Sequence, residues 1–140
     1  RPGGSYTAFD LAGRRAAILI CYDVELAPHV AALRDQGVEL ILVPTANMRP
    51  FEHVGRHVVP AMAANHALSI VYANYCGQEA HLSFYGGSSI TGADGQVLAR
   101  AGAGPCLLIA SLAQHDPAVL STQARDLRVI ATPVQTGPGA

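Results

Sequence analysis

The sequence predicts an α/β fold, and three observations favour it. Short, mostly apolar runs at residues 16–20, 39–46 and 67–75 are typical of strands buried on both faces of a parallel sheet. Segments of helical character separate these runs. Later in the chain, a Gly-Gly pair and an Asp-Gly pair bracket two short alternating runs, as in an antiparallel hairpin. Half of the 140 residues are apolar, which is enough to bury the core of one domain or of part of a larger one.

The first unit of this fold is a strand, a helix and a second strand. The first apolar run is the first strand. A segment that opens near Pro28 predicts a helix through Arg34, which Gly37 ends. Residues 39–46 predict the next strand, which we expect Pro44 to stop. Such a strand–helix–strand unit has a right-handed crossover.

The second unit repeats this order and leads into the hairpin. Residues 56–66 are alanine-rich and predict a helix, with Pro60 near its start or at a kink. Residues 67–75 predict a strand of β-branched and aromatic residues. The hairpin strands follow at residues 88–91 and 96–100, so the predicted sheet has both parallel and antiparallel strands.

The carboxyl-terminal part continues with weaker signals. Residues 105–113 predict one more apolar strand, and residues 117–127 predict a weak helix. Residues 133–140 are rich in Pro and Gly and predict an irregular tail. Cys106 lies in the predicted strand and Cys76 in an apolar stretch upstream, so both are predicted to be core thiols.

Composition and charge exclude several classes of protein. The net charge of −1 supplies no basic field to attract nucleic acid or an anionic membrane, so a small-molecule ligand is the better prediction. No apolar run approaches the about 20 residues that span a bilayer, and no signal-peptide pattern opens the sequence. Three widely spaced cysteines indicate neither a disulfide framework nor a zinc site, which fits a cytoplasmic protein. Only 14% of the residues are charged, against roughly 25% in ordinary soluble domains, which predicts a surface covered by a partner.

Cys21 is the strongest candidate for a catalytic residue. It follows the first apolar strand at its carboxyl end, where open α/β sheets place their ligand crevices. At a strand-to-helix turn, backbone N–H groups lower the pKa of a thiol and bind an oxyanion. Free cysteine is also among the most buried residue types, so a packing thiol stays open as the alternative.

Four segments in order resemble the carbon–nitrogen hydrolase family, the nitrilase-like amidases. They are the approach to the cysteine RPGGSYTAFDLAGRRAAILICYDVEL, the following GVELILVPTANM, the helix and strand VPAMAANHALSIVYANYCGQE, and the hairpin FYGGSSITGADGQVLARAG. Together they extend over residues 1–104. Several motifs in the right order are far more specific than any one of them alone.

The resemblance implies an α-β-β-α sandwich, with residues 1–140 as a single domain that is incomplete at its amino-terminal side and is roughly the carboxyl-terminal half. It implies hydrolysis of an amide, N-carbamoyl or nitrile carbon–nitrogen bond through a thioester on Cys21, with the backbone N–H of Tyr22 as the candidate donor to the oxyanion. In the family a glutamate base and a lysine precede the cysteine, so both are expected upstream of this chain. No metal and no organic cofactor is implied. The expected partners are a small amide or nitrile substrate, the upstream half of the same domain, and further copies in a homodimer or larger homo-oligomer.

The chain departs from the family pattern in three places. After Cys21 the family has Phe-Pro-Glu, whereas this chain has Leu-Ala-Pro ending at Pro28. In the helix, Met62 and Asn65 stand where the family has an arginine and a glutamate, and we interpret this as a change in packing rather than in chemistry. The chain also has no lysine and no glutamate before Cys21, so the 140 residues alone are expected to be inactive.

Other polar residues have simpler interpretations. Asp23 is predicted to cap the helix after the turn. Asn47, at the end of the second strand, is a candidate for the pocket wall and for substrate binding. His53 and His57 are four residues apart, but no third ligand follows at a recognisable interval. A solvated helix face is therefore expected there rather than a metal site.

Three functions from different classes remain open at this point. A cysteine amidohydrolase agrees with most of the residues. A glutamine-amidotransferase-like enzyme would have glycines around its nucleophile, whereas Ile20 and Tyr22 flank Cys21. A catalytically inactive binding or assembly fragment of the same fold would share every motif above. Only the upstream Glu and Lys distinguish that fragment from the enzyme.

Overall fold

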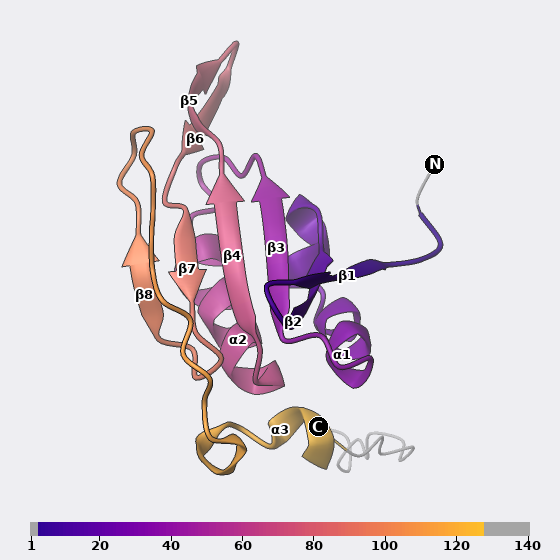
Figure 1. The fold of residues 1–140 in the computed structure, drawn as a ribbon. Coiled ribbons are helices and arrows are strands. Elements are labelled where there is room, and N and C mark those ends of the chain that lie inside the picture. Colours follow the sequence, from indigo (N-terminus) through magenta and orange to yellow (C-terminus); the bar gives the residue numbers. More distant parts are fainter. Residues whose placement is uncertain (1–2, 128–140) are drawn as a thin grey trace, which may run out of the picture.

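The computed structural model of the protein describes residues 3–127 and contains a six-stranded mixed sheet and a separate two-stranded hairpin (Figure 1). The strands are β1 (Thr7–Leu11), β2 (Arg14–Ile18), β3 (Leu40–Thr45), β4 (Ser69–Asn74), β5 (Cys76–Glu79), β6 (Leu82–Tyr85), β7 (Ser89–Thr91) and β8 (Val97–Arg100). The α-helices are α1 (Ala27–Asp35), α2 (Val59–His66) and α3 (Gln123–Asp126). The other helical turns are η1 (Cys21–Glu25, 3₁₀), η2 (Val54–Val58, π) and η3 (Pro117–Val119, 3₁₀).

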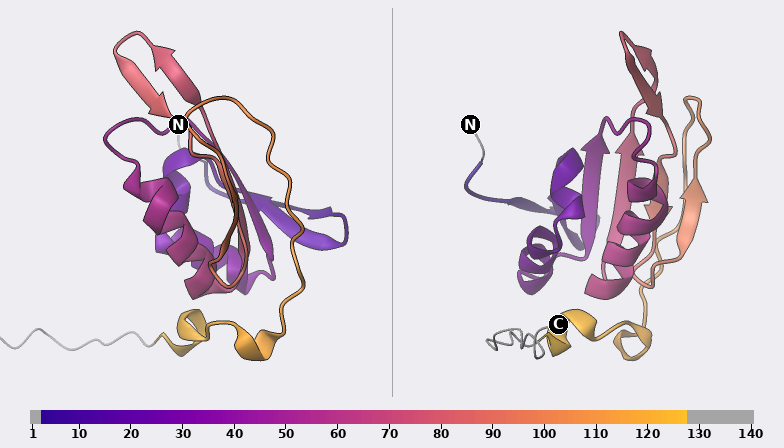
Figure 2. Two further views of the ribbon diagram at one scale, coloured as in Figure 1. Left: turned by 90° about the vertical axis from the view of Figure 1, so that its left-hand side faces the viewer. Right: turned by 180° about the vertical axis from the view of Figure 1, so that it is seen from behind.

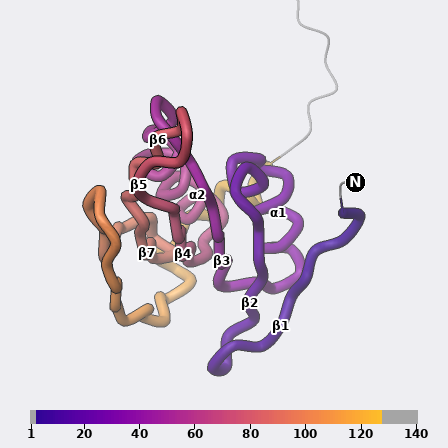
Figure 3. The backbone as a smooth tube through the Cα atoms, turned by 90° about the horizontal axis from the view of Figure 1, so that it is seen from above, coloured from indigo at the N-terminus to yellow at the C-terminus, as the bar shows by residue number. Residues whose placement is uncertain are grey.

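The parallel strands β2, β3 and β4 form the centre of the sheet, whose order is β1-β2-β3-β4-β7-β8. This arrangement confirms the two predicted strand–helix units and the antiparallel β7–β8 hairpin. Helices α1 and α2 cover the same face of the sheet (Figure 3). The aligned residues Ala17, Ile41 and Ile70 are fully buried in one apolar cluster with Leu33 of α1 and Val59 of α2. The core therefore lies between the sheet and these two helices.

The opposite face of the sheet carries a second apolar row. Ile18, Leu42, Val71 and Ile90 are neighbours in register across β2, β3, β4 and β7. Ile18 is 39% exposed, and the other three are half-buried. The segment after β8 runs along this face towards η3 and α3 (Figure 2). The described chain thus provides one helical layer and one sheet layer, which is half of the expected α-β-β-α sandwich.

Strand β3 differs from its prediction, because Pro44 does not stop it and the strand continues to Thr45. The carbonyl of Leu42 accepts a hydrogen bond from the N–H of Leu19 at 3.1 Å, so the polar groups of Leu42 face β2. The nitrogen of Pro44, two residues later, points to the same side. Strand β2 has already ended at Ile18, so the missing N–H costs no hydrogen bond of the sheet.

The prediction of a strand at residues 105–113 is wrong. The segment forms no strand, and Leu107 and Ile109 are 84% and 82% exposed. Cys106 is exposed and Cys76 of β5 is only half-buried, so neither is the core thiol that we predicted. Apolar composition favours a strand here, but no neighbouring strand of the described chain pairs with it.

Several smaller features complete the fold. The predicted helix at 56–66 is formed by η2 and α2 and begins earlier, at Val54. The weak helix predicted at 117–127 is replaced by the short elements η3 and α3. Strands β1, β5 and β6 were not predicted. The predicted tail at 133–140 lies outside the described residues. Within residues 3–127, no helix combines the length and apolarity needed to cross a membrane.

Candidate active site

The carboxyl ends of β2, β3 and β4 meet at one edge of the sheet, because these three strands are parallel and paired in register. Cys21 follows β2, Asn47 follows β3, and Asn74 is the last residue of β4. The β5–β6 hairpin extends beyond this same edge (Figure 1). We call this part of the molecule the carboxyl edge. The predicted site residues Cys21, Tyr22 and Asn47 all follow strands that end at this edge, and Asn74, which was not predicted, lies there too.

Cys21 has an unusual backbone conformation. Its φ is 52°, in the left-handed region that non-glycine residues rarely adopt, and it is the first residue of the 3₁₀ turn η1. Holding a side chain there costs on the order of 1–3 kcal/mol, and such strain is concentrated at functional sites. The residue is half-buried rather than enclosed in the core. The structure thus has a strained, half-buried cysteine at the point where open α/β sheets bind ligands.

Asp23 closes the turn that contains Cys21. Its backbone N–H donates to the carbonyl of Ile20 at 3.1 Å, and its Oδ2 accepts from the N–H of Ile20 at 3.3 Å. The prediction that Asp23 caps α1 is therefore wrong in its target. The carboxylate stabilises η1 instead, and α1 begins after Leu26, with Pro28 in its first turn.

The backbone around Tyr22 suits the proposed oxyanion donor. The first N–H groups of a helical turn have no acceptor within the turn, and those of Cys21 and Tyr22 are the first in η1. The side chain of Tyr22 is 64% exposed and is not needed for this contact. An oxygen held beside the thiol can thus accept from backbone donors whose positions the turn fixes.

Asn47 is buried, and its side-chain amide holds the loop that follows β3. Its Nδ2 donates to the carbonyl of Phe51 at 3.1 Å and to the hydroxyl of Tyr72 at 3.2 Å. Burial, followed by the neighbouring Tyr85 hydroxyl, raises the pKa of Tyr72 well above its usual value. Tyr72 therefore stays a neutral hydroxyl at physiological pH. The role of Asn47 in substrate binding stays a prediction.

The loop at residues 46–53 ends close to the turn of Cys21. Burial raises the pKa of Glu25 in η1, and the Coulombic influence of His53 opposes this by a smaller amount. The turn η1 contacts β3 and α2, which stand at the two ends of the segment that holds this loop. His53 and His57 are both exposed, which agrees with the expected solvated face. Among residues 3–127, no cluster of three His, Cys, Asp or Glu side chains has the arrangement to hold a metal ion.

Sequence reasoning missed Asn74. Its side chain bonds to the backbone of both Asn47 and Gly86, so it joins two loops at the carboxyl edge. A signal was present, because Asn74 ends the third parallel strand just as Asn47 follows the second. Applying the rule about carboxyl ends to every predicted strand would have selected it.

Two cavities lie at different ends of the sheet. One of about 910 Å³ is beside the Cys21 turn, lined by Ile20, Asp23 and residues 3–7, and the Tyr6 hydroxyl lies 2.6 Å from Nδ1 of His29 across it. The other, of about 560 Å³, is at the opposite edge, lined in part by Arg14, Arg34 and residues 113–115.

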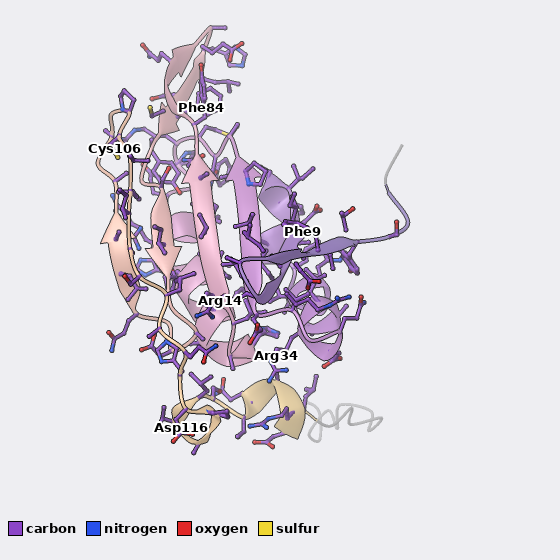
Figure 4. All side chains as sticks on the ribbon, viewed as in Figure 1. Phe9, Arg14, Arg34, Phe84, Cys106 and Asp116 are labelled. Carbon is purple, nitrogen blue, oxygen red and sulfur yellow. The ribbon has the colours of Figure 1, made fainter. Side chains whose placement is uncertain are left out.

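At that opposite edge the arginines bind backbone carbonyls. Arg34 donates to the carbonyl of His66 at 2.9 Å, at the end of α2, and Arg14 donates to Leu112 at 2.8 Å (Figure 4 labels both arginines). The charge of Arg34 thus offsets the negative end of the α2 dipole.

Comparisons with known proteins agree with this geometry. The sequence model of the carbon–nitrogen hydrolase family matches residues 1–118. A protein of Pseudomonas protegens described as "Hydrolase in pqqF 5′ region" is 42% identical over 103 residues, which are 74% of this chain and 36% of that protein. An (R)-stereoselective amidase of Pseudomonas sp is 37% identical over 102 residues, which are 72% of this chain and 37% of that protein.

Solved structures match the fold. A crystal structure of an amidase from Nesterenkonia sp. has a TM-score of 0.80 at 35% identity and covers 91% of this chain and 46% of that one. A glutamate-to-glutamine mutant from strain AN1, with the acetamide moiety of fluoroacetamide added at the active site cysteine, has a TM-score of 0.73 at 37% identity, covering 76% and 41%. A cysteine-to-alanine mutant in complex with butyramide has a TM-score of 0.80 at 36% identity, covering 91% and 47%. The chain spans less than half the length of these relatives, and the half-sandwich that we describe agrees with that share.

Proposed function

This chain belongs to the carbon–nitrogen hydrolase family, and we propose from that premise that it carries the nucleophile of a cysteine amidohydrolase. The observation that carries the proposal is the left-handed backbone of Cys21, with φ of 52°, at the carboxyl edge of the sheet. Ala12, Ala67 and Ala80 have a similar φ of 49–52°, so the strain supports a nucleophile only together with the place of Cys21 at the carboxyl edge. A half-buried nucleophile there lies beside the first backbone N–H donors of η1.

In the proposed reaction, the thiolate of Cys21 attacks the carbon of an amide and forms a tetrahedral oxyanion. The N–H of Tyr22 donates to that oxygen, and one such donor contributes about 2.7–4 kcal/mol to the transition state. The carbon–nitrogen bond then breaks, and the nitrogen takes a proton and leaves as ammonia or an amine. Water attacks the remaining thioester, which releases the acid and restores Cys21. The glutamate base and the lysine are expected from residues upstream of this chain.

Small aliphatic amides are the substrates to test first. The Nesterenkonia amidase binds butyramide as a mutant and carries an acetamide group on its cysteine as another mutant. N-carbamoyl compounds and nitriles are the alternatives within the same chemistry. The half-buried position of Cys21 supports a small acyl group.

We also propose that the upstream half of the domain covers the open face of the sheet. The apolar row of Ile18, Leu42, Val71 and Ile90 is only partly buried, and Leu107 and Ile109 are exposed in an extended segment beside it. Apolar faces larger than a few hundred Å² are rare on monomers. The relatives are more than twice as long as the matched segment, so a domain of their length contains further residues that can cover this face.

Alkylation of the complete protein tests the nucleophile. We expect iodoacetamide to modify Cys21 and to abolish hydrolysis of butyramide in proportion to its modification, and Cys21→Ala to lower kcat by at least about 10⁴-fold. Cys76→Ala is the matched control and should retain turnover, because Cys76 lies in the hairpin away from the turn. Full turnover by the Cys21→Ala variant would refute the assignment. A correctly folded wild type without any amide or nitrile turnover would favour the inactive assembly fragment.

A further inference from the structure

The side chain of Asn74 is fully engaged in hydrogen bonds at the carboxyl edge. Its Oδ1 accepts from the N–H of Asn47 at 2.7 Å. Its Nδ2 donates to the carbonyl of Asn47 at 3.2 Å and to the carbonyl of Gly86 at 2.7 Å. A side-chain amide has one acceptor oxygen and two N–H donors, so each of these groups has a partner.

These bonds extend the sheet beyond the point where its backbone pairing ends. The last pair between β3 and β4 is Thr45 with Asn74, followed by a bond from the N–H of Tyr75 to the carbonyl of Thr45 at 2.9 Å. The amide of Asn74 then makes the next two-bond contact with Asn47 in place of a peptide group. Ser88 adds to this from the other side, since its Oγ accepts from the N–H of Asn74 at 2.9 Å and donates to its carbonyl at 3.2 Å.

Both segments that Asn74 joins lie beside the Cys21 turn or the hairpin above it. The loop at 46–53 connects β3 to η2 and α2, and both β3 and α2 contact η1, the turn of the nucleophile. The same loop contacts β6, where the N–H of Arg49 donates to the carbonyl of Ser83 at 2.9 Å. Asn47 therefore lies in the segment that connects the elements packed against η1 with the hairpin beyond the carboxyl edge.

The turn at Gly86 has no freedom to compensate for a lost bond. Its φ is 66°, and an added Cβ would lie 2.7 Å from the carbonyl oxygen of Gly102. The N–H of Gly87 also donates to that oxygen, at 3.0 Å. The Gly86 carbonyl is thus presented to Asn74 by a tight, fixed turn.

We propose that Asn74 is a positioning residue for the amidase reaction, which holds the loop at 46–53 and the Gly86–Ser88 turn in place at the carboxyl edge, the edge that β2 and the nucleophile turn also reach. The inference rests on the proposed function. Asn74 does not touch the reacting atoms, and it acts through the backbone of Asn47. Misplacing a catalytic group by about 1 Å costs up to about 10²-fold in rate, so a residue of this kind affects turnover without taking part in the chemistry.

Only an amide meets all three contacts. Aspartate has the same shape and keeps the bond from the N–H of Asn47, but it loses both donors and places a carboxylate against the carbonyls of Asn47 and Gly86. Alanine loses all three bonds and leaves both carbonyls without their partner. Asn74→Asp and Asn74→Ala therefore separate the shape of the side chain from its donors.

The experiment uses the complete protein, with Asn65→Ala as the control because Asn65 is exposed on α2. We expect both Asn74 variants to lower kcat/KM for butyramide by about 10- to 100-fold at a temperature where circular dichroism shows them folded. The loss of kcat/KM in Asn74→Asp, relative to the wild type at the same pH, should shrink as the pH falls from about 8 to about 5, because a protonated carboxyl regains one donor. Asn74→Ala should show no such recovery, and the control should stay within twofold of the wild type.

The rate of Cys21 alkylation by iodoacetamide is measured in parallel, because it needs no turnover. We expect it to change by at least about threefold in both Asn74 variants. Folded variants with wild-type kcat/KM and wild-type alkylation would overturn the inference, and so would equal losses in the Asn65→Ala control. A wild type without turnover would refute the proposed function alone, since the alkylation rates still decide the role of Asn74.

Discussion

The carboxyl edge of the sheet and the segment after β8 differ in how many partners their side chains have within the described chain. At the carboxyl edge, Asn47 and Asn74 bond to one another and to the loops around them. In the segment at 105–113, Leu107 and Ile109 are largely exposed, and an anchoring contact is the bond from Arg14 to the carbonyl of Leu112.

The difference shows what the chain supplies by itself. Residues 16–20 find their neighbours in β3 and in η1, within about 25 residues, so the strand forms from local partners. Residues 105–113 have similar apolarity but no adjacent strand among the described residues. Apolar composition sets a preference for the extended state, and the partner decides whether a sheet forms.

The largest expected effect concerns the isolated chain of 140 residues. Each 100 Å² of apolar surface left in water forfeits about 2.5 kcal/mol, so the open sheet face and the exposed segment favour association. We expect light scattering to find a dimer, a larger assembly or an aggregate. A monodisperse species of 14.6 kDa that unfolds cooperatively would contradict this, and it would mean that the segment at 105–113 needs no partner.

A pair of substitutions in the complete protein sharpens the comparison. Leu33→Ala should lower the free energy of unfolding by about 2–5 kcal/mol, because Leu33 is fully buried between α1 and the sheet. Ile109→Ser should cost about 1–2 kcal/mol if the upstream half covers the segment as we propose. Chemical denaturation measures both. A cost within 0.5 kcal/mol for Ile109→Ser would mean that the residue stays exposed, as it is in this structure.

The smallest expected effect is on the pH dependence of stability. Burial raises the pKa of Glu25 above its ordinary value of 4.5, so the folded state binds more protons than the unfolded state just above that pH. Stability therefore falls as the pH rises from 4.5 through the raised pKa. Glu25→Gln should remove this fall, with its advantage over wild type growing across that window and disappearing below it.

Thermal unfolding of the complete protein at a series of pH values measures this effect. Glu79→Gln is the control, because it changes the same charge in the exposed part of β5. If Glu25→Gln and wild type lost stability in parallel as the pH rose, the burial of this carboxylate would have no energetic consequence.

Local patterns predicted the elements that depend on local partners. The apolar runs of β2, β3 and β4 and the helical segment of α1 can be recognised in the sequence. The ends of the first two runs allowed the prediction that Cys21 and Asn47 lie at one edge. The predicted end of β3 at Pro44 was wrong. A proline interrupts a strand only where the neighbouring strand offers a carbonyl to its missing N–H, and β2 has already ended at this level. That is a property of the neighbouring strand and not of the proline.

Other features depend on contacts between distant residues and could not be predicted in this way. The helix before β4 begins with the π turn η2, where Gly55 is so close to β6 that an added Cβ would lie 2.6 Å from the Tyr85 hydroxyl. The role of Asn74 depends on the carbonyl of Gly86, which reaches it only after the β5–β6 hairpin has formed. The left-handed backbone of Cys21 likewise follows from the path between β2 and α1.

The strained backbone of Cys21 also has a consequence for how this site changes under selection. Glycine adopts a φ of 52° without penalty, so Cys21→Gly would relieve on the order of 1 kcal/mol at the cost of the thiol. In a lineage that no longer needed catalysis, replacing this cysteine by glycine would therefore raise the stability of the fold without any cost in function. The presence of cysteine at this left-handed position therefore indicates that selection still acts on its thiol.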